Sequence, residues 1–181
     1  NIPVIVVSSG MTPIIRSIFS NLIGEKDANE IEVISNDVKF TDPEQTGKTW
    51  ELVYRHPDNA FGHDKSQSIL PYRKMANPPL LFFAGDGISD MSAARHADVL
   101  FVKDKKDNDL ATYCDNNKIG YHLFKDWTIP KKMLEDVCTQ VTDAAHLRQG
   151  DRGRHHYQHE PVDRGPSVVV SRDTCRSAAR P

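Results

Sequence analysis

Three short runs of consecutive apolar residues most constrain how this chain can fold. They span residues 2–7, 80–84 and 99–102. Runs of this length that are rich in β-branched or aromatic residues, without polar alternation, are typical of strands buried on both faces of a sheet. Segments with helical character separate them. We therefore predict an α/β fold, in which helices cover both faces of a mostly parallel, Rossmann-like sheet in a three-layer arrangement.

The remaining elements follow from local signals. Strands are expected at 31–34 and 50–54, and the polar segment 42–47 between them favours a hairpin-like excursion. Helices are predicted at 12–22, 63–75 (with a break near Pro71), 89–96, 109–116 and 130–137, and a last short strand at 121–124. In sheets of this kind, ligands bind beyond the carboxyl ends of the strands, so polar residues at those ends are the candidate functional residues.

Composition excludes several classes of protein. The 181 residues carry a formal net charge of −2, which gives no reason to expect nucleic acid or an anionic membrane as a partner. The apolar runs are far too short to cross a bilayer. The three cysteines, Cys114, Cys138 and Cys175, have neither metal nor redox spacing, so we expect reduced thiols and a cytoplasmic protein. The sequence does not indicate an oligomeric state.

The character of the chain changes near residue 140. Residues 1–139 contain every lysine, whereas residues 140–181 are rich in arginine and histidine and have few apolar residues besides 168–170. Such a segment buries too little surface to offset its ordering entropy, so we predict that the tail is disordered. His155, His156 and His159 lie close enough in sequence to suggest a metal site, but they do not match the zinc-protease spacing, and we interpret them as solvated.

The first functional motif is Ser8-Ser9-Gly10, directly after the first apolar run. The Ser8 hydroxyl and the amides of Ser9 and Gly10 could converge on an anion such as phosphate. Taken alone, the motif is better explained by a serine that caps the following helix.

The second motif is Gly62-His63-Asp64-Lys65-Ser66, at the start of the helix predicted at 63–75, with Lys65 as its cationic residue. It could balance the charge of a phosphate group, although in isolation an ordinary surface lysine is the simpler interpretation.

The third motif is Gly85-Asp86-Gly87-Ile88-Ser89-Asp90, directly after the second apolar run. The glycines permit a tight turn, and Asp86 and Asp90 offer the hard carboxylate oxygens that Mg²⁺ prefers. The alternative is a turn in which Asp90 caps a helix; the succession of strand, turn and acid pair favours a metal site. Together the three motifs predict a phosphate cradle with a divalent cation.

This order of motifs resembles the haloacid dehalogenase superfamily, in particular its phosphoserine-phosphatase-like branch, over about residues 2–139. The resemblance implies that Ser8 and the Ser9 amide bind the transferring phosphoryl group and that Lys65 neutralises it. It also implies that Asp86 binds Mg²⁺ directly and that Asp90 holds the metal or its water shell. By the same resemblance, the hairpin between 31 and 54 flanks the active site.

One departure from the family pattern affects both chemistry and fold. The superfamily's first motif, Asp-x-Asp-x-Thr/Val, precedes the second, and its first aspartate is the nucleophile. It is absent from residues 1–181; the segment starting at Asp107 is a decoy, because it follows a charged run rather than a buried strand. The resemblance places the strand of that motif at the sheet centre, so we expect a gap of about 10 Å there. The cap that selects substrate is expected to be missing too.

Our interpretation from sequence is a partial phosphatase core at 1–139 followed by a tail at 140–181. It would be a magnesium-dependent phosphomonoesterase of a small phosphorylated metabolite, inactive without the missing motif. The alternative is a non-catalytic module of the same fold that binds phosphate or a partner. A dinucleotide-binding protein is disfavoured, because no Gly-x-Gly-x-x-Gly follows a strand.

Overall fold

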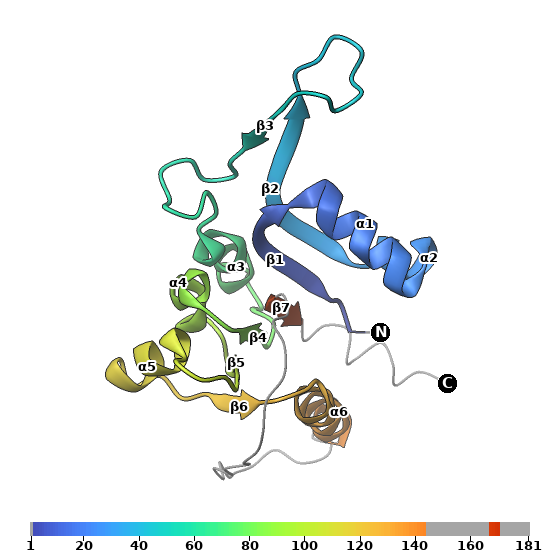
Figure 1. Ribbon diagram of the computed structural model, residues 1–181. Coiled ribbons are helices and arrows are strands. Elements are labelled where there is room, and N and C mark those ends of the chain that lie inside the picture. Colours follow the sequence, from blue (N-terminus) through green and yellow to red (C-terminus); the bar gives the residue numbers. More distant parts are fainter. Residues whose placement is uncertain (1, 144–166, 171–181) are drawn as a thin grey trace.

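The computed structural model describes residues 2–143 and 167–170, and the side chains of residues 2–139. Helices and strands alternate along most of this range (Figure 1). The elements are β1 (Ile5–Met11), α1 (Thr12–Ile23), α2 (Glu25–Asn29), β2 (Glu32–Phe40), β3 (Trp50–Val53), α3 (Lys65–Arg73), β4 (Phe82–Gly85), the 3₁₀ turn η1 (Ile88–Asp90), α4 (Met91–Ala94), β5 (Val99–Lys103), α5 (Asp109–Asn116), β6 (His122–Phe124), α6 (Thr128–Asp143) and β7 (Ser167–Val170).

The described strands form one sheet in the order β3-β2-β1-β7-β4-β5-β6. Neighbours β1 and β2, β4 and β5, and β5 and β6 run parallel, whereas β3 and β7 run antiparallel to the strands beside them. The predicted α/β class with parallel strands is therefore confirmed, and the complete sheet is mixed.

The centre of the sheet differs from the sequence expectation. Instead of a gap, β7 lies between β1 and β4 and pairs with both, with Val169 opposite Ile5 on one side and Phe83 on the other. This strand contains the one apolar run of the predicted tail, and β-branched residues suit a sheet interior. Its position satisfies backbone groups that would otherwise be left unpaired beside β1 and β4. Residues 140–143 of the predicted tail belong to α6, and its other residues, including its histidines, lie outside the described residues.

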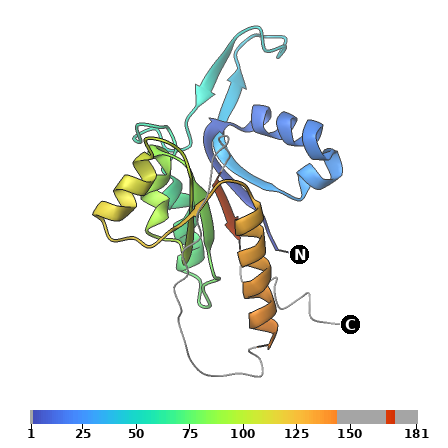
Figure 2. The ribbon, with the colours of Figure 1, turned by 60° about the horizontal axis from the view of Figure 1, so that its bottom comes forward.

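Hydrophobic clusters cover both faces of the sheet. One cluster joins Val7, Phe83 and Val102 in the strands to Ile69 of α3 and Leu110 of α5. The other packs residues of β4, β5 and β6 against Met133, Leu134 and Val137 of α6, which crosses the opposite face (Figure 2). These two layers around the sheet are the arrangement that the unbroken apolar runs predict.

A hairpin extends away from this core. It is formed by strands β2 and β3, and its outer part leaves the body of the molecule, whereas α1 and α2 lie alongside β1 and β2 (Figure 1). β2 runs well past its predicted end, because its outer half pairs with β3 rather than with the core. Within the described residues, no helix is both long enough and apolar enough to span a membrane.

The cysteines differ in state. Cys114 is a free thiol buried in α5, as predicted. Cys138 in α6 is disulfide-bonded, so the prediction that all three thiols are reduced is wrong. Widely separated cysteines carry no local signal of pairing, because only the fold brings them together.

Candidate functional site

The carboxyl ends of β1 and β4 lie at the same edge of the sheet. Both strands run antiparallel to β7, so they point in the same direction. Ser8 comes directly after the three buried residues of β1, towards the carboxyl end of the strand, and Asp86 follows β4 immediately. The topology therefore places the first and third sequence motifs at one edge of the sheet.

The serine motif is an irregular stretch of strand and not a helix cap. Register with β2 is interrupted between Val7 and Met11, which frees the residues between them from a regular ladder. The Ser8 hydroxyl accepts a hydrogen bond from the Gly10 amide at 3.0 Å. Helix α1 begins after Met11 without a side-chain cap, so the capping interpretation of Ser8 is excluded.

Two buried side chains hold the carbonyls of this stretch. His63, 1% exposed, approaches the Ser8 carbonyl with Nδ1 at 2.7 Å and the Ser68 hydroxyl with Nε2 at 2.8 Å. Asn36, also 1% exposed, donates from Nδ2 to the Ser9 carbonyl at 2.9 Å. Sequence reasoning missed both residues. Asn36 has no local signal in the sequence, whereas His63 lies within the Gly62-His63-Asp64-Lys65-Ser66 motif.

Burial lowers the pKa of His63 below its usual value of 6.5. The hydrogen bond to the Ser8 carbonyl opposes this shift, and positive charge at His56, Arg55 and Lys65 adds to it. The net effect favours a neutral imidazole beside the serine motif.

Lys65 is the first residue of α3 and is buried, so it is not an ordinary surface lysine. Asp64 caps the helix by accepting from the Ser66 amide at 3.0 Å. This cap sets the start of α3 two residues later than the sequence suggested, and it directs Lys65 towards η1. The Lys65 ammonium lies 2.6 Å from Asp90 Oδ1, in an ion pair whose side chains are 7% and 2% exposed.

Asp90 also shapes the acid turn. Its Oδ2 accepts from the amides of Asp86 at 2.9 Å and Gly87 at 3.1 Å, so both carboxylate oxygens are engaged. Gly85 must approach this side chain closely, because a Cβ on it would lie 2.7 Å from Asp90 Cγ. The glycine before Asp86 is thus explained by packing.

Asp86 is the more accessible acid of the pair. Its Oδ2 lies 3.5 Å from the ammonium of Lys105, and the two side chains are 24% and 30% exposed. Lys105 follows β5 and was missed by sequence reasoning, because it stands in a run of charged residues that looks like a solvated loop. Among the described side chains, no group of three or more His, Cys, Asp or Glu could hold a metal ion.

The predicted residues thus fall into two linked groups. Lys65, Asp86 and Asp90 are joined by direct contacts. Ser8 is joined to the start of α3 through His63, two residues before Lys65. Their roles in binding phosphate and Mg²⁺ stay predictions.

Known proteins share this sequence pattern. The chain is 40% identical over 132 residues to polyol phosphate phosphatase PYP1 of Saccharomyces cerevisiae, covering 68% of the chain and 52% of that protein. It is 40% identical over 139 residues to Pdp3-interacting factor 1 of Schizosaccharomyces pombe, covering 76% and 58%. It is 29% identical over 142 residues to 2-hydroxy-3-keto-5-methylthiopentenyl-1-phosphate phosphatase of Bacillus thuringiensis, covering 78% and 56%.

The chain belongs to the haloacid dehalogenase superfamily. It spans little more than half the length of these superfamily relatives. No family model matches the chain, and no solved structure matches it.

Proposed function

We propose that this chain carries the phosphate-binding and magnesium-binding parts of a magnesium-dependent phosphomonoesterase that acts on a small phosphorylated metabolite. The supporting observation is the position of Lys65. It starts a helix that His63 ties to the Ser8 carbonyl, and it contacts the carboxylate that organises the Asp86 turn. A buried ammonium that contacts the acid turn, at the start of a helix tied to the serine motif, suits a dianion.

Each group in this proposal has a defined task. The Ser8 hydroxyl and the amides of Ser9 and Gly10 bind the phosphoryl oxygens, and Lys65 neutralises their charge and orients the group. The Ser9 Oγ atom is buried and has no hydrogen-bond partner in the described part of the chain. A buried hydroxyl without a partner is unfavourable, which supports an additional polar group here when the site is occupied.

In our proposal the two predicted metal-binding acids, Asp86 and Asp90, differ in how they would hold Mg²⁺. Asp86 offers a partly exposed carboxylate, and Mg²⁺ in phosphoryl-transfer sites usually takes one or two carboxylates together with water and substrate phosphate. Asp90 is engaged with Lys65 and two amides, so in our proposal it acts on the metal through water and holds Asp86 in place. The ion would supply positive charge that neutralises the phosphate oxygens.

The substrate class is supported by two relatives. One is named as a phosphatase of polyol phosphate and the other of a phosphorylated methylthiopentenyl compound. Both names describe small phosphorylated metabolites, which is the class predicted from the sequence.

The proposal assigns the nucleophile to a segment other than residues 1–181, on a strand between β1 and β4. In this chain β7 takes that position and runs antiparallel to both neighbours. Since no Asp-x-Asp motif follows a buried strand in residues 1–181, we expect these residues to bind phosphate without turning over a phosphate ester.

Two assays on purified residues 1–181 test the proposal. Calorimetry with inorganic phosphate should show binding that strengthens with Mg²⁺ and weakens about tenfold or more in Lys65→Met, since a buried ion contact is lost. Lys48→Met, at an exposed lysine of the hairpin loop, is the matched control and should bind like the parent chain. A parent chain without phosphate affinity would contradict the binding role.

The second assay uses p-nitrophenyl phosphate with and without Mg²⁺. We expect no hydrolysis above background. Magnesium-dependent turnover that disappears in Asp86→Asn would show that the nucleophile lies within residues 1–181.

A second function, a non-catalytic partner-binding module, has its own support. Ile14, Ile18 and Leu22 form one face of α1 and are 49%, 50% and 74% exposed, and large apolar residues at this spacing suit a contact surface. One relative is named as an interacting factor of another protein. Phosphate affinity in the calorimetric assay separates the two functions, because a module of this kind does not require it.

A further inference from the structure

The two carbonyls of the serine motif are both held by buried side chains from other elements. Ser8 is held by His63, which precedes α3, and Ser9 by Asn36 of β2. These contacts join segments that lie 55 and 27 residues apart in the chain. Neither side chain belongs to the predicted phosphate-binding set.

A trans peptide is planar, with its N–H directed opposite to its C=O. The described chain has no cis peptide bond. When His63 holds the Ser8 carbonyl, it therefore directs the Ser9 amide away from the imidazole. Asn36 in the same way sets the orientation of the Gly10 amide, which donates to Ser8 Oγ.

The hydrogen bonds of His63 also define its tautomer. A carbonyl oxygen only accepts, so Nδ1 must carry the proton that it donates to Ser8. A neutral ring then accepts at Nε2, and the Ser68 hydroxyl donates to it. His63 is thus held at both ring nitrogens and is only 1% exposed.

We propose that His63, in its Nδ1–H tautomer, is a positioning residue that together with Asn36 orients the peptide planes of Ser8-Ser9-Gly10. Substitution of His63 gives the more discriminating test, because two conservative variants each keep a different one of its two hydrogen bonds. The amide nitrogen of asparagine is as many bonds from Cβ as Nδ1, and that of glutamine is as many bonds from Cβ as Nε2. His63→Asn therefore keeps a donor for Ser8, whereas His63→Gln keeps the Ser68 contact and leaves the Ser8 carbonyl without a partner.

Two NMR measurements test this inference without any ligand. The imidazole ¹⁵N shifts of His63 should report a proton on Nδ1 and a bare Nε2 at neutral pH. Amide exchange at Ser9 and Gly10 should be at least about threefold faster in His63→Gln than in His63→Asn, from the loss of one net hydrogen bond. A proton on Nε2 alone, or equal exchange in the two variants, would overturn the inference.

Asn36→Asp gives a further check on the second carbonyl. The substitution keeps the shape of the side chain but replaces the donor to Ser9 with a carboxylate, so exchange at Gly10 should rise. His96→Gln is the matched control, since His96 lies at the end of α4 and makes no side-chain contact with the serine motif in the described hydrogen bonds. It should leave exchange at Ser9 and Gly10 unchanged.

A phosphate-binding measurement rests on the proposed function. It separates failure of that proposed function from failure of the inference about His63. With inorganic phosphate and Mg²⁺, His63→Gln should bind about tenfold more weakly than His63→Asn. If the parent chain binds no phosphate while the exchange difference is present, the proposed function fails and the positioning role of His63 stands. If the parent binds phosphate and both variants bind it equally, His63 does not position the phosphate-binding groups.

Discussion

The two halves of the candidate site are built from different interactions. The serine half uses neutral groups, in which an imidazole and an amide hold two carbonyls at 2.7 and 2.9 Å. The acid half uses charge, in which the Lys65 ammonium pairs with Asp90 at 2.6 Å and Lys105 lies beside Asp86. The difference is physical, because orienting peptide groups needs only donors, whereas holding a lysine in the interior needs a counter-ion.

The comparison predicts which change destabilises each half of the site. The acid half should lose stability when a charge is removed or when its close packing is crowded. The serine half should be sensitive to protonation of a histidine. An exposed ion pair elsewhere in the molecule provides the reference for both.

The largest effect is expected for Asp90→Ala. It leaves Lys65 buried without this counter-ion and removes the acceptor for the amides of Asp86 and Gly87. Loss of one partner of a buried ion pair lowers the free energy of unfolding by about 3–5 kcal/mol. Urea denaturation followed by circular dichroism measures this change. A loss below about 1 kcal/mol would show that the acid half does not depend on charge.

The next effect tests close packing in the acid half. In Gly85→Ala the new Cβ would lie 2.7–2.8 Å from atoms of the Asp90 side chain, and overpacking of this kind lowers stability by about 1–3 kcal/mol. Gly87→Ala is the matched control: its Cβ meets nothing within 4 Å, and its φ of −155° is open to any residue. Equal urea midpoints for the two variants would contradict the packing of Asp90 against Gly85.

A smaller effect concerns pH and tests the serine half. Burial lowers the pKa of His63 and also that of His96 from 6.5, so near and below that pH the unfolded chain binds more protons than the folded chain. The stability due to neutral imidazoles is complete above about pH 6.5 and falls as pH decreases towards the lowered values. Urea midpoints from pH 8 to pH 5 should show this loss.

His63→Asn supplies the control for the pH effect. The variant removes the His63 imidazole and should flatten the pH dependence, leaving the part due to His96. An unchanged slope in this variant would show that His63 is not protonated on unfolding.

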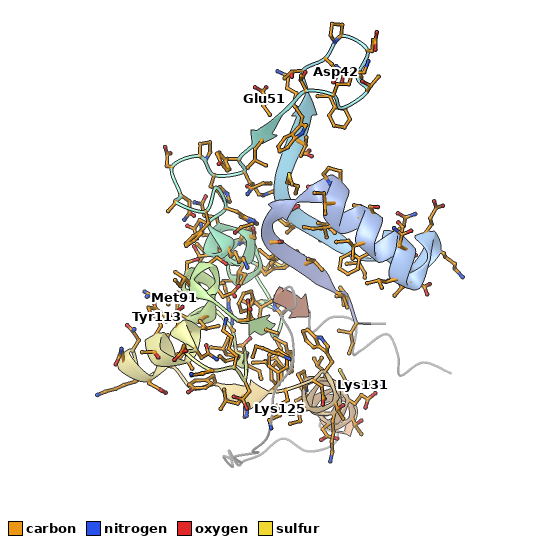
Figure 3. The ribbon with its side chains drawn as sticks, viewed as in Figure 1. Asp42, Glu51, Met91, Tyr113, Lys125 and Lys131 are labelled. Atoms are coloured by element: carbon orange, nitrogen blue, oxygen red, sulfur yellow. The ribbon has the colours of Figure 1, made fainter. Side chains whose placement is uncertain are left out.

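The smallest effect is expected at the exposed pair of Glu44 and Lys48. Their side chains are 70% and 72% exposed, in the loop at the outer end of the hairpin, where Figure 3 shows Asp42 far from Met91 at the start of α4. Glu44→Gln should change the free energy of unfolding by no more than about 0.5 kcal/mol, and added salt should remove the difference. A loss similar to that of Asp90→Ala would remove the contrast between buried and exposed charge.

Much of this architecture could be predicted from local patterns. Runs such as 80–84 and 99–102 are apolar throughout, and an unbroken apolar strand can be stable only between two covering layers. The sequence Gly85-Asp86-Gly87 after a strand predicted a turn at a sheet edge, and the turn is there. These inferences succeed because the signal lies within a few neighbouring residues.

Other features had no local signal. Nothing adjacent to Asn36 indicates that it holds the Ser9 carbonyl, and nothing near Lys105 indicates a contact with Asp86. The disulfide of Cys138 and the placement of β7 between β1 and β4 likewise depend on segments that meet only when the chain folds.

The sequence by itself determined the α/β class, the strands of the sheet other than β7 and the residue types offered at its carboxyl edge, because hydrophobic periodicity and turn chemistry act over short distances along the chain. Only the tertiary structure decided that Asp90 is committed to Lys65, that His63 holds the Ser8 carbonyl and that β7 occupies the centre of the sheet. Hydrogen bonds and buried ion pairs depend on distances of about 3 Å between groups remote in sequence, and such distances are fixed by packing and not by spacing along the chain.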